Sequence, residues 1–213
     1  MKRLIELAQN IKDEELRKRV VEFLKDPKLS NKDFKKYPRM KIEDAGSMFT
    51  VGGPAGSASV ERDVLNHTIT LANLCMDTAN EMEKNHGVTI NKDYLIAAAL
   101  LHDIAKIFEW KRVGQSLEHT GIMLDHTMLG TAELYTRGFP EGVIHIVASH
   151  FGEGGPTPPR NLEALILHHL DNMISIAEFH ICGSKKQESM QLILLDEETI
   201  KKIAGGKPEK KSE

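Results

Sequence analysis

Apolar residues recur at helical spacing along most of this chain, and the alternation typical of β-strands is hardly seen. Between residues 13 and 25, Leu16, Val20, Val21 and Leu24 share one helical face, and Pro27 ends the pattern. The same spacing predicts further helices over residues 4–8, about 60–85, 91–110, 125–136, 142–151 and 162–178. The pattern therefore predicts an all-α protein.

The stretch from Pro27 to about Val60 breaks this pattern. It is rich in Gly, Pro, Ser and Lys and includes Gly-Gly-Pro-Ala-Gly at 52–56, so it is expected to be a long connection. Ser57 or Ser59 would cap the helix that follows, and Asn91 would cap the next one. A connection of this length is more often functional than idle.

A chain of 213 residues can bury one sizeable core, and no boundary between comparable domains is evident. We expect residues 1–45 to form an N-terminal helical extension packed on the core, and 46–185 to form the main domain. Residues 186–213 would be a C-terminal segment whose final ten residues are disordered.

Composition narrows the possible partners and location. A net charge of -3 lacks the basic bias that long nucleic-acid tracks require. The N-terminus lacks the apolar run of a signal peptide, and no stretch is long enough to span a bilayer. Only two cysteines are present, which suits a reducing compartment. A cytoplasmic location is therefore expected, without a membrane or long nucleic acid as partner; the oligomeric state is left open.

Several histidines and aspartates fall in or beside the predicted helices: His67, His102, Asp103, His126, His150 and Asp171. Such side chains converging from separate helices would hold one or two divalent metal ions. Each alone has a simpler explanation, either a satisfied core histidine or a solvated helix face. Their joint occurrence favours a metal site.

The segment YLIAAALLHDIAKIFEW, at 94–110, is the most informative helix. His102 and Lys106 are four residues apart and would share a face, with Asp103 about a third of a turn away. The three side chains can therefore border one cavity. A solvated lysine at a helix end is the alternative for Lys106.

The order of these residues resembles the HD-domain phosphohydrolase superfamily. The resemblance covers about residues 50–180 and is carried by LNHT around His67, LLHDIAK at 100–106, LDHTMLG around His126, ASHFGEG around His150 and LHHLDN at 167–172. Within the superfamily it resembles the branch of 3'-5' exoribonucleases with an HD core and small archaeal, dihydroneopterin-type 2',3'-cyclic phosphate phosphodiesterases. It implies a compact multi-helix HD-domain fold.

The resemblance also implies ligand roles. A first metal would be held by His67, His102, Asp103 and Asp171. His126 and His150 would hold a second metal, with Asp103 bridging the two. Phe151 stands where several relatives have a second histidine, which leaves full occupancy of the second site open. His168, one turn before Asp171, would support the ligands from behind.

The chemistry expected from this resemblance is hydrolysis by metal-activated water. Asp103 would act as the bridging ligand, and Lys106 would stabilise charge on the phosphoryl group. Iron(II) or manganese(II) is the expected metal, since imidazole and carboxylate ligands are compatible with both.

Further polar residues are expected at the entrance to the site: Trp110, Lys111, Arg112, His119 and Arg160. Arg112 would bind phosphate and Trp110 would stack on a heterocycle. Surface basicity and a core tryptophan are the alternatives.

The exoribonuclease relatives carry an oligonucleotide-binding barrel before the HD core, whereas the pattern of the first 45 residues here predicts helices and a loop. The expected function is therefore hydrolysis of a small nucleotide-like or pterin-like cyclic phosphodiester. A nucleotide phosphomonoesterase, a di-iron oxygenase and a non-catalytic nucleotide-binding regulatory domain are the alternatives.

Overall fold

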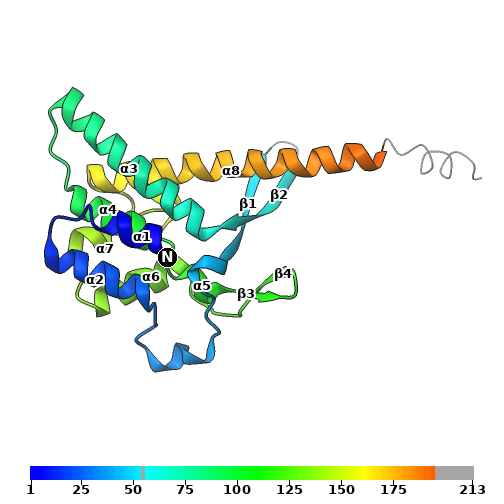
Figure 1. The fold of residues 1–213 in the computed structure, drawn as a ribbon, viewed down its shortest axis with the longest axis horizontal. Coiled ribbons are helices and arrows are strands. Elements are labelled where there is room, and N and C mark those ends of the chain that lie inside the picture. The colour runs from blue at the N-terminus through cyan, green and yellow to red at the C-terminus, as the bar shows by residue number, and fades with distance from the viewer. Residues whose placement is uncertain (54–55, 195–213) are drawn as a thin grey trace, which may run out of the picture.

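A computed structural model describes residues 1–53 and 56–194 (Figure 1). The longer helices are α1 (Lys2–Ala8), α2 (Glu14–Lys25), α3 (Val64–His86), α4 (Lys92–Leu101), α6 (His126–Thr136), α7 (Glu141–Ala148) and α8 (Leu162–Leu194). Between them lie the one-turn helix α5 (Lys106–Glu109) and two hairpins, β1 (Gly46–Gly53) with β2 (Gly56–Asp63) and β3 (Trp110–Val113) with β4 (Ser116–His119). Short 3₁₀ turns occupy Lys32–Lys36, Ile42–Asp44 and Gly152–Gly154. The all-α prediction is confirmed, with the hairpins as additions.

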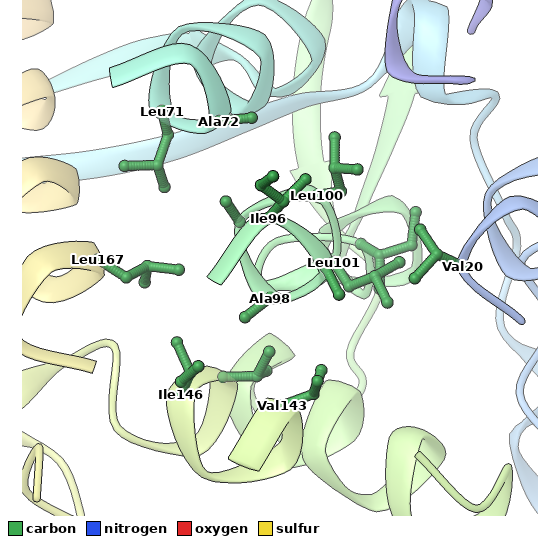
Figure 2. Packing of buried hydrophobic residues seen from close by; sticks show 14 of the residues in the cluster. Val20, Leu71, Ala72, Ile96, Ala98, Leu100, Leu101, Val143, Ile146 and Leu167 are labelled. Carbon is green, nitrogen blue, oxygen red and sulfur yellow. The ribbon is translucent and has the colours of Figure 1, made fainter. Parts of the chain in front are cut away.

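Helix α4 is the centre of the hydrophobic core. Every residue from Leu95 to Leu101 is buried, as expected for a helix that is apolar all round. Figure 2 shows its side chains surrounded by residues of four other helices: Leu71 and Ala72 of α3, Leu167 of α8, Val143 and Ile146 of α7, and Val20 of α2. Small alanines on α4 let these helices approach closely. The end of α4 is therefore held at the middle of the molecule.

Several helix starts follow the capping residues of the sequence. Asn91 accepts a hydrogen bond from the Tyr94 amide at the start of α4, as predicted. The predicted Ser57 or Ser59 cap is wrong: α3 begins after Asp63, whose carboxylate accepts from the Asn66 amide at 2.9 Å. Helix α3 starts late because the residues before it belong to β2.

The prediction of a loop over residues 27–60 is also wrong, because these residues include most of a β-hairpin. Strands β1 and β2 pair antiparallel from Gly46 opposite Asp63 to Gly53 opposite Gly56. Over residues 59–63 of β2, for which burial is described, Val60 and Arg62 are buried and Glu61 between them is exposed. A charged residue at an inward position hides the alternation by which a strand is recognised.

The predicted continuous helix over 91–110 is interrupted at its most important point. Helix α4 ends at Leu101, and the amides of Ile104 and Lys106 bond carbonyls three residues back rather than four. His102 and Asp103 therefore lie in a tight turn at the buried end of α4. The chain then enters α5 and the second hairpin.

Helix α8 is longer than the predicted 162–178 and extends beyond the body of the protein (Figure 1). It packs against α3 and lies beside β2. The expected boundary between residues 185 and 186 falls inside this helix, and the expected disordered tail lies outside the described residues. No helix in the described ranges is long and apolar enough to cross a membrane.

Candidate metal centre

Six potential ligands meet at the end of α4, although they come from five separate segments. They are His67 of α3, His102 and Asp103 of the turn after α4, His126 at the start of α6, His150 after α7, and Asp171 of α8. Nearly all are fully buried, and Asp171 retains 13% of its side-chain exposure. The fold thus brings together the six residues proposed as metal ligands.

The ligand atoms form two groups. Those of His67, His102 and Asp171 lie within 4.8 Å of one another, with Nε2 of His67 3.0 Å from Oδ1 of Asp171. Those of Asp103, His126 and His150 form the second group at the same spacing. Each group has the size of a site for one ion.

Asp103 joins the two groups. Its Oδ2 lies 3.4 Å from Nε2 of His102, and its Oδ1 lies 3.3 Å from Nε2 of His126. One carboxylate therefore faces both groups, which is the placement expected of a bridging ligand.

All four imidazoles direct Nδ1 away from the centre toward an acceptor. The acceptors are Glu178 for His67 at 3.2 Å, the Ala99 carbonyl for His102 at 2.9 Å, Glu109 for His126 at 3.2 Å, and the Val147 carbonyl for His150 at 2.7 Å. Donation from Nδ1 leaves the Nε2 lone pair directed inward, and acceptors of this kind are the usual partners of metal-ligating histidines.

Four buried polar atoms at the centre lack a hydrogen-bond partner among the described residues: Nε2 of His67, His102 and His126, and Oδ1 of Asp103. An unpaired buried polar atom is costly, so a cluster of them needs another explanation. Imidazole nitrogen with carboxylate oxygen is a donor set for divalent transition metals. The residues present fit a metal centre.

The ionisation of the site suits this purpose. Burial opposes charge on Asp103, but His102 and Lys106 outweigh it and hold the pKa of that carboxyl well below its usual range. For Asp171 burial is likewise outweighed, chiefly by His67, and the pKa is lowered. Burial and the neighbouring imidazoles lower the pKa of His150 to about 3. At neutral pH both acids are charged and His150 is neutral, as metal ligands must be.

His67 behaves differently from His150. Burial alone would lower the pKa of His67, but Asp171 and Glu178 outweigh it and raise the pKa. A proton on His67 and a metal ion at its Nε2 therefore compete for the same position.

A cavity of about 430 Å³ opens over the centre. It is lined by Ser47, Met48, Phe49, Arg62, Lys106, Glu109, Trp110, His126, His150, Phe151, His168, Asp171, Asn172 and Ser175. Lys106 is 9% exposed, and its Nζ donates to Oδ2 of Asp103 at 2.7 Å. The cavity therefore combines ligand atoms, cationic side chains and aromatic walls.

Of the residues expected at the entrance to the site, some line the cavity over the metal centre and others do not. Trp110 lines the cavity. Lys111 and Arg112 instead line a separate cavity of about 820 Å³, where Arg112 pairs with Glu61 at 2.7 Å. Carboxylates on the two hairpins draw these cations away from the metal centre, since Lys111 pairs with Glu118 at 3.3 Å.

His119 and Arg160, which were also expected at the entrance, do not line the cavity over the metal centre. His119 packs edge-on against Trp110, with ring centroids 5.5 Å apart. The backbone amide of Arg160 donates to Nε2 of His145 at 3.1 Å.

His168 supports the turn that carries His150. Its Nδ1 donates to the His150 carbonyl at 2.8 Å, and its ring lies against Gly152. Gly152 has φ +63°, and a Cβ there would lie 2.4 Å from the imidazole. A glycine is needed at this position for both reasons.

Three charged residues at the site were not identified in the sequence. Glu178 follows Asp171 by seven residues, which is two turns of the predicted helix, and that spacing is a usable signal. Glu109 follows His102 by seven residues, but the helix is interrupted between them, and Glu109 contacts His126 instead. Arg62 gave no such signal, because its strand was itself hidden.

Comparison with known proteins agrees with this geometry. The sequence model of the HD domain matches residues 64–175. The chain belongs to the HD domain family. It is 38% identical over 199 residues to the dihydroneopterin 2',3'-cyclic phosphate phosphodiesterase of Methanocaldococcus jannaschii, covering 88% of this chain and 75% of that protein. The resemblance stated from the motifs is confirmed.

More limited similarity connects this HD-family chain with larger enzymes. It is 38% identical over 94 residues to the 3'-5' exoribonuclease YhaM of Oceanobacillus iheyensis and 34% identical over 97 residues to that of a Geobacillus species. These matches cover 38% and 40% of this chain but only 30% of either exoribonuclease. No solved structure matches the chain significantly.

Proposed function

We propose that this protein is a metal-dependent phosphodiesterase that hydrolyses a small cyclic phosphodiester carried by a nucleotide-like or pterin-like group. The observation that carries the proposal is the pair of ligand groups joined by Asp103 at the base of a cavity. Membership of the HD domain family and similarity to the archaeal phosphodiesterase support the same activity.

In this proposal one ion is held by His67, His102, Asp103 and Asp171, and a second by Asp103, His126 and His150. Iron(II) or manganese(II) suits these ligands. Bound divalent metals of this kind polarise a phosphoryl oxygen and make water nucleophilic near neutral pH.

The chain's own residues then do the remaining work. Asp103 contributes one carboxylate oxygen to each ligand group and so fixes their relative position. Glu109 fixes the orientation of His126, and Glu178 fixes that of His67. Lys106 offsets the charge of Asp103 and faces the cavity, where it stabilises negative charge on the reacting phosphoryl group.

The cavity favours a small substrate. Its volume of about 430 Å³ is within the usual range for sites that bind small molecules. Phe49, Trp110 and Phe151 contribute aromatic surface on which a planar heterocycle can stack. A site of this size suits a small molecule better than a long RNA strand.

The test is hydrolysis by protein that has been stripped of metal and reloaded with manganese or, under argon, iron. Bis-p-nitrophenyl phosphate, 2',3'-cyclic nucleotides and the cyclic phosphate of a pterin would be assayed beside the matching monoesters. We expect the cyclic diesters to be turned over fastest and the metal-stripped protein to be inactive. Absence of diester hydrolysis with every metal would overturn the proposal.

We also propose a cytoplasmic location. Cys75 and Cys182 are both free thiols, which suits a reducing compartment. Fractionation of native cells would test this, and recovery of the protein outside the cytoplasm would contradict it.

A further inference from the structure

Arg62 is a buried cation that none of the sequence motifs includes. It comes from β2, its side chain is only 5% exposed, and it lines the cavity over the metal centre. A buried guanidinium must be paired, because removal of its charge from water is costly. Its partners therefore indicate what it does.

Three groups hold the guanidinium in one orientation. Nε donates to Oε2 of Glu178 at 2.8 Å, and Nη2 donates to Oγ of Ser175. The guanidinium carbon lies 4.3 Å from the centre of the Phe49 ring. Two partners are on α8 and one is on β1, so the hairpin and the long helix clamp the residue together.

The remaining nitrogen, Nη1, has no hydrogen-bond partner among the described residues. It forms an ion pair with Oδ2 of Asp103 at 3.9 Å, which is beyond hydrogen-bond distance. An arginine has five N–H donors, and the two on Nη1 are therefore uncommitted. They lie beside the carboxylate that joins the two ligand groups.

We propose that Arg62 binds a non-bridging oxygen of the substrate's phosphoryl group through Nη1, with Glu178 as the positioning residue that holds it there. This inference rests on the proposed function. A guanidinium is well suited to phosphate oxygens because its donors are planar and its charge is permanent. Lys106 supplies a second cation at the cavity, but its ammonium is a point charge without the planar pair of donors that a guanidinium offers.

Glu178 connects this anion site to the metal centre. The same carboxylate accepts from Nε of Arg62 and contacts Nδ1 of His67 at 3.2 Å. Metal binding at His67 and phosphate binding at Arg62 therefore both depend on one side chain. Because binding free energies coupled through a shared group are reciprocal, a metal ion at His67 and a phosphate at Arg62 must change each other's affinity by the same factor.

The experiment compares Arg62→Gln and Arg62→Lys with wild type, using calorimetric binding of inorganic phosphate and steady-state hydrolysis of a cyclic diester. We expect Arg62→Gln to weaken phosphate binding and to raise KM, each by about 10- to 100-fold, the effect of losing a hydrogen bond to a charged group. Metal content should change little. Arg62→Lys retains the charge but not the planar donors, so its phosphate affinity should be intermediate.

Arg137→Gln is the matched control. Arg137 also donates from Nε to a glutamate, Glu133, at 2.7 Å, and its guanidinium lies 4.2 Å from the centre of the Phe23 ring. It is outside the cavity lining, so its variant should retain wild-type phosphate affinity and KM.

Glu178→Gln tests the positioning role. At matched metal content we expect it to weaken phosphate binding, with little further effect when added to Arg62→Gln, because the two residues act as a unit. A merely structural glutamate would weaken binding to the same extent in both backgrounds, and that result would overturn its assignment.

The outcomes separate the two proposals. If wild type hydrolyses the diester and Arg62→Gln retains both KM and phosphate affinity, the inference about Arg62 is overturned and the proposed function stands. If wild type is inactive with every metal, the proposed function fails, and phosphate binding decides the role of Arg62 alone. Should Arg62→Gln not fold, wild-type phosphate affinity in a folded Arg62→Lys protein would overturn the inference.

Discussion

Asp103 is the residue on which the metal centre depends, since its two oxygens face separate ligand groups and its side chain is 1% exposed. Asp103→Asn keeps the shape but removes the charge. We expect it to lose most bound metal and to reduce turnover to about 1% or less, because both ions share this ligand. Metal analysis and diester hydrolysis would measure this.

The matched control is Asp77→Asn, an exposed aspartate of α3, which should behave as wild type. Helix content by circular dichroism should be similar in both variants. Full metal stoichiometry in Asp103→Asn would contradict the bridging role.

Gly152 is required by both its backbone and its surroundings. Gly152→Ala would place a methyl group 2.4 Å from the His168 ring at φ +63°. We expect a loss of about 1–3 kcal/mol in the free energy of unfolding, measured by urea titration. Gly114→Ala separates the effect of the positive φ from the effect of the contact with His168, because Gly114 has φ +62° but nothing within 4 Å of its Cβ position. Equal losses in the two variants would show that contact with His168 is unimportant.

His150 makes the stability of the metal-free protein depend on pH. Burial and the neighbouring imidazoles lower its pKa to about 3, while in the unfolded chain it titrates near its ordinary value of 6.5. Below pH 6.5 the imidazole of His150 binds a proton in the unfolded chain but not in the folded protein. The contribution of His150 to the free energy of unfolding therefore declines as pH falls from 6.5 toward 3. Between pH 7 and pH 5 this amounts to about 2 kcal/mol.

Urea unfolding of metal-free wild type and His150→Gln at these two pH values would measure the effect. We expect the variant to lose less stability on acidification than wild type. Since His67 is shifted in the opposite direction and is present in both proteins, the comparison isolates His150. Identical pH dependence in the two proteins would contradict it.

At the scale of elements, helix α8 brings Asp171 and Glu178 to the site and is anchored on α4 through Leu167 (Figure 2). Leu167→Ala should cost about 2–5 kcal/mol in the free energy of unfolding, because it leaves a cavity beside α4. It should also weaken metal binding. Leu165→Ala is the control, since Leu165 is on the same helix but 39% exposed. Equal unfolding midpoints for the two variants would show that this contact does not anchor α8.

Hairpin β1–β2 is the element that most changes the interpretation of the site. It brings Ser47, Phe49 and Arg62 over the metal centre, in a region that the sequence pattern assigned to a loop and to the start of the next helix. Its inward positions include polar and charged residues, so neither alternation nor propensity could reveal it. The partners of Arg62, Ser175 and Glu178, lie more than a hundred residues away.

At the scale of the whole molecule, the proposed ions connect segments from α3 to α8 and should stabilise the folded protein. With metal at a hundred times its dissociation constant, the gain is about 2.7 kcal/mol. Removal by a chelator should therefore lower Tm by roughly 5–10 °C, and manganese should restore it. Scanning fluorimetry would measure this. A Tm unaffected by either treatment would contradict metal binding by the folded protein.

The sequence by itself determined the helical class, many helix bounds, the cap at Asn91 and the six candidate ligands, because these depend on local spacing and on residue chemistry. Only the tertiary structure decided the break after Leu101, the two hairpins, and the direction of Lys111 and Arg112 away from the site. It also decided which acceptors orient each imidazole and that Arg62 faces the centre. These features depend on partners distant in the chain, and local spacing carries no information about such partners.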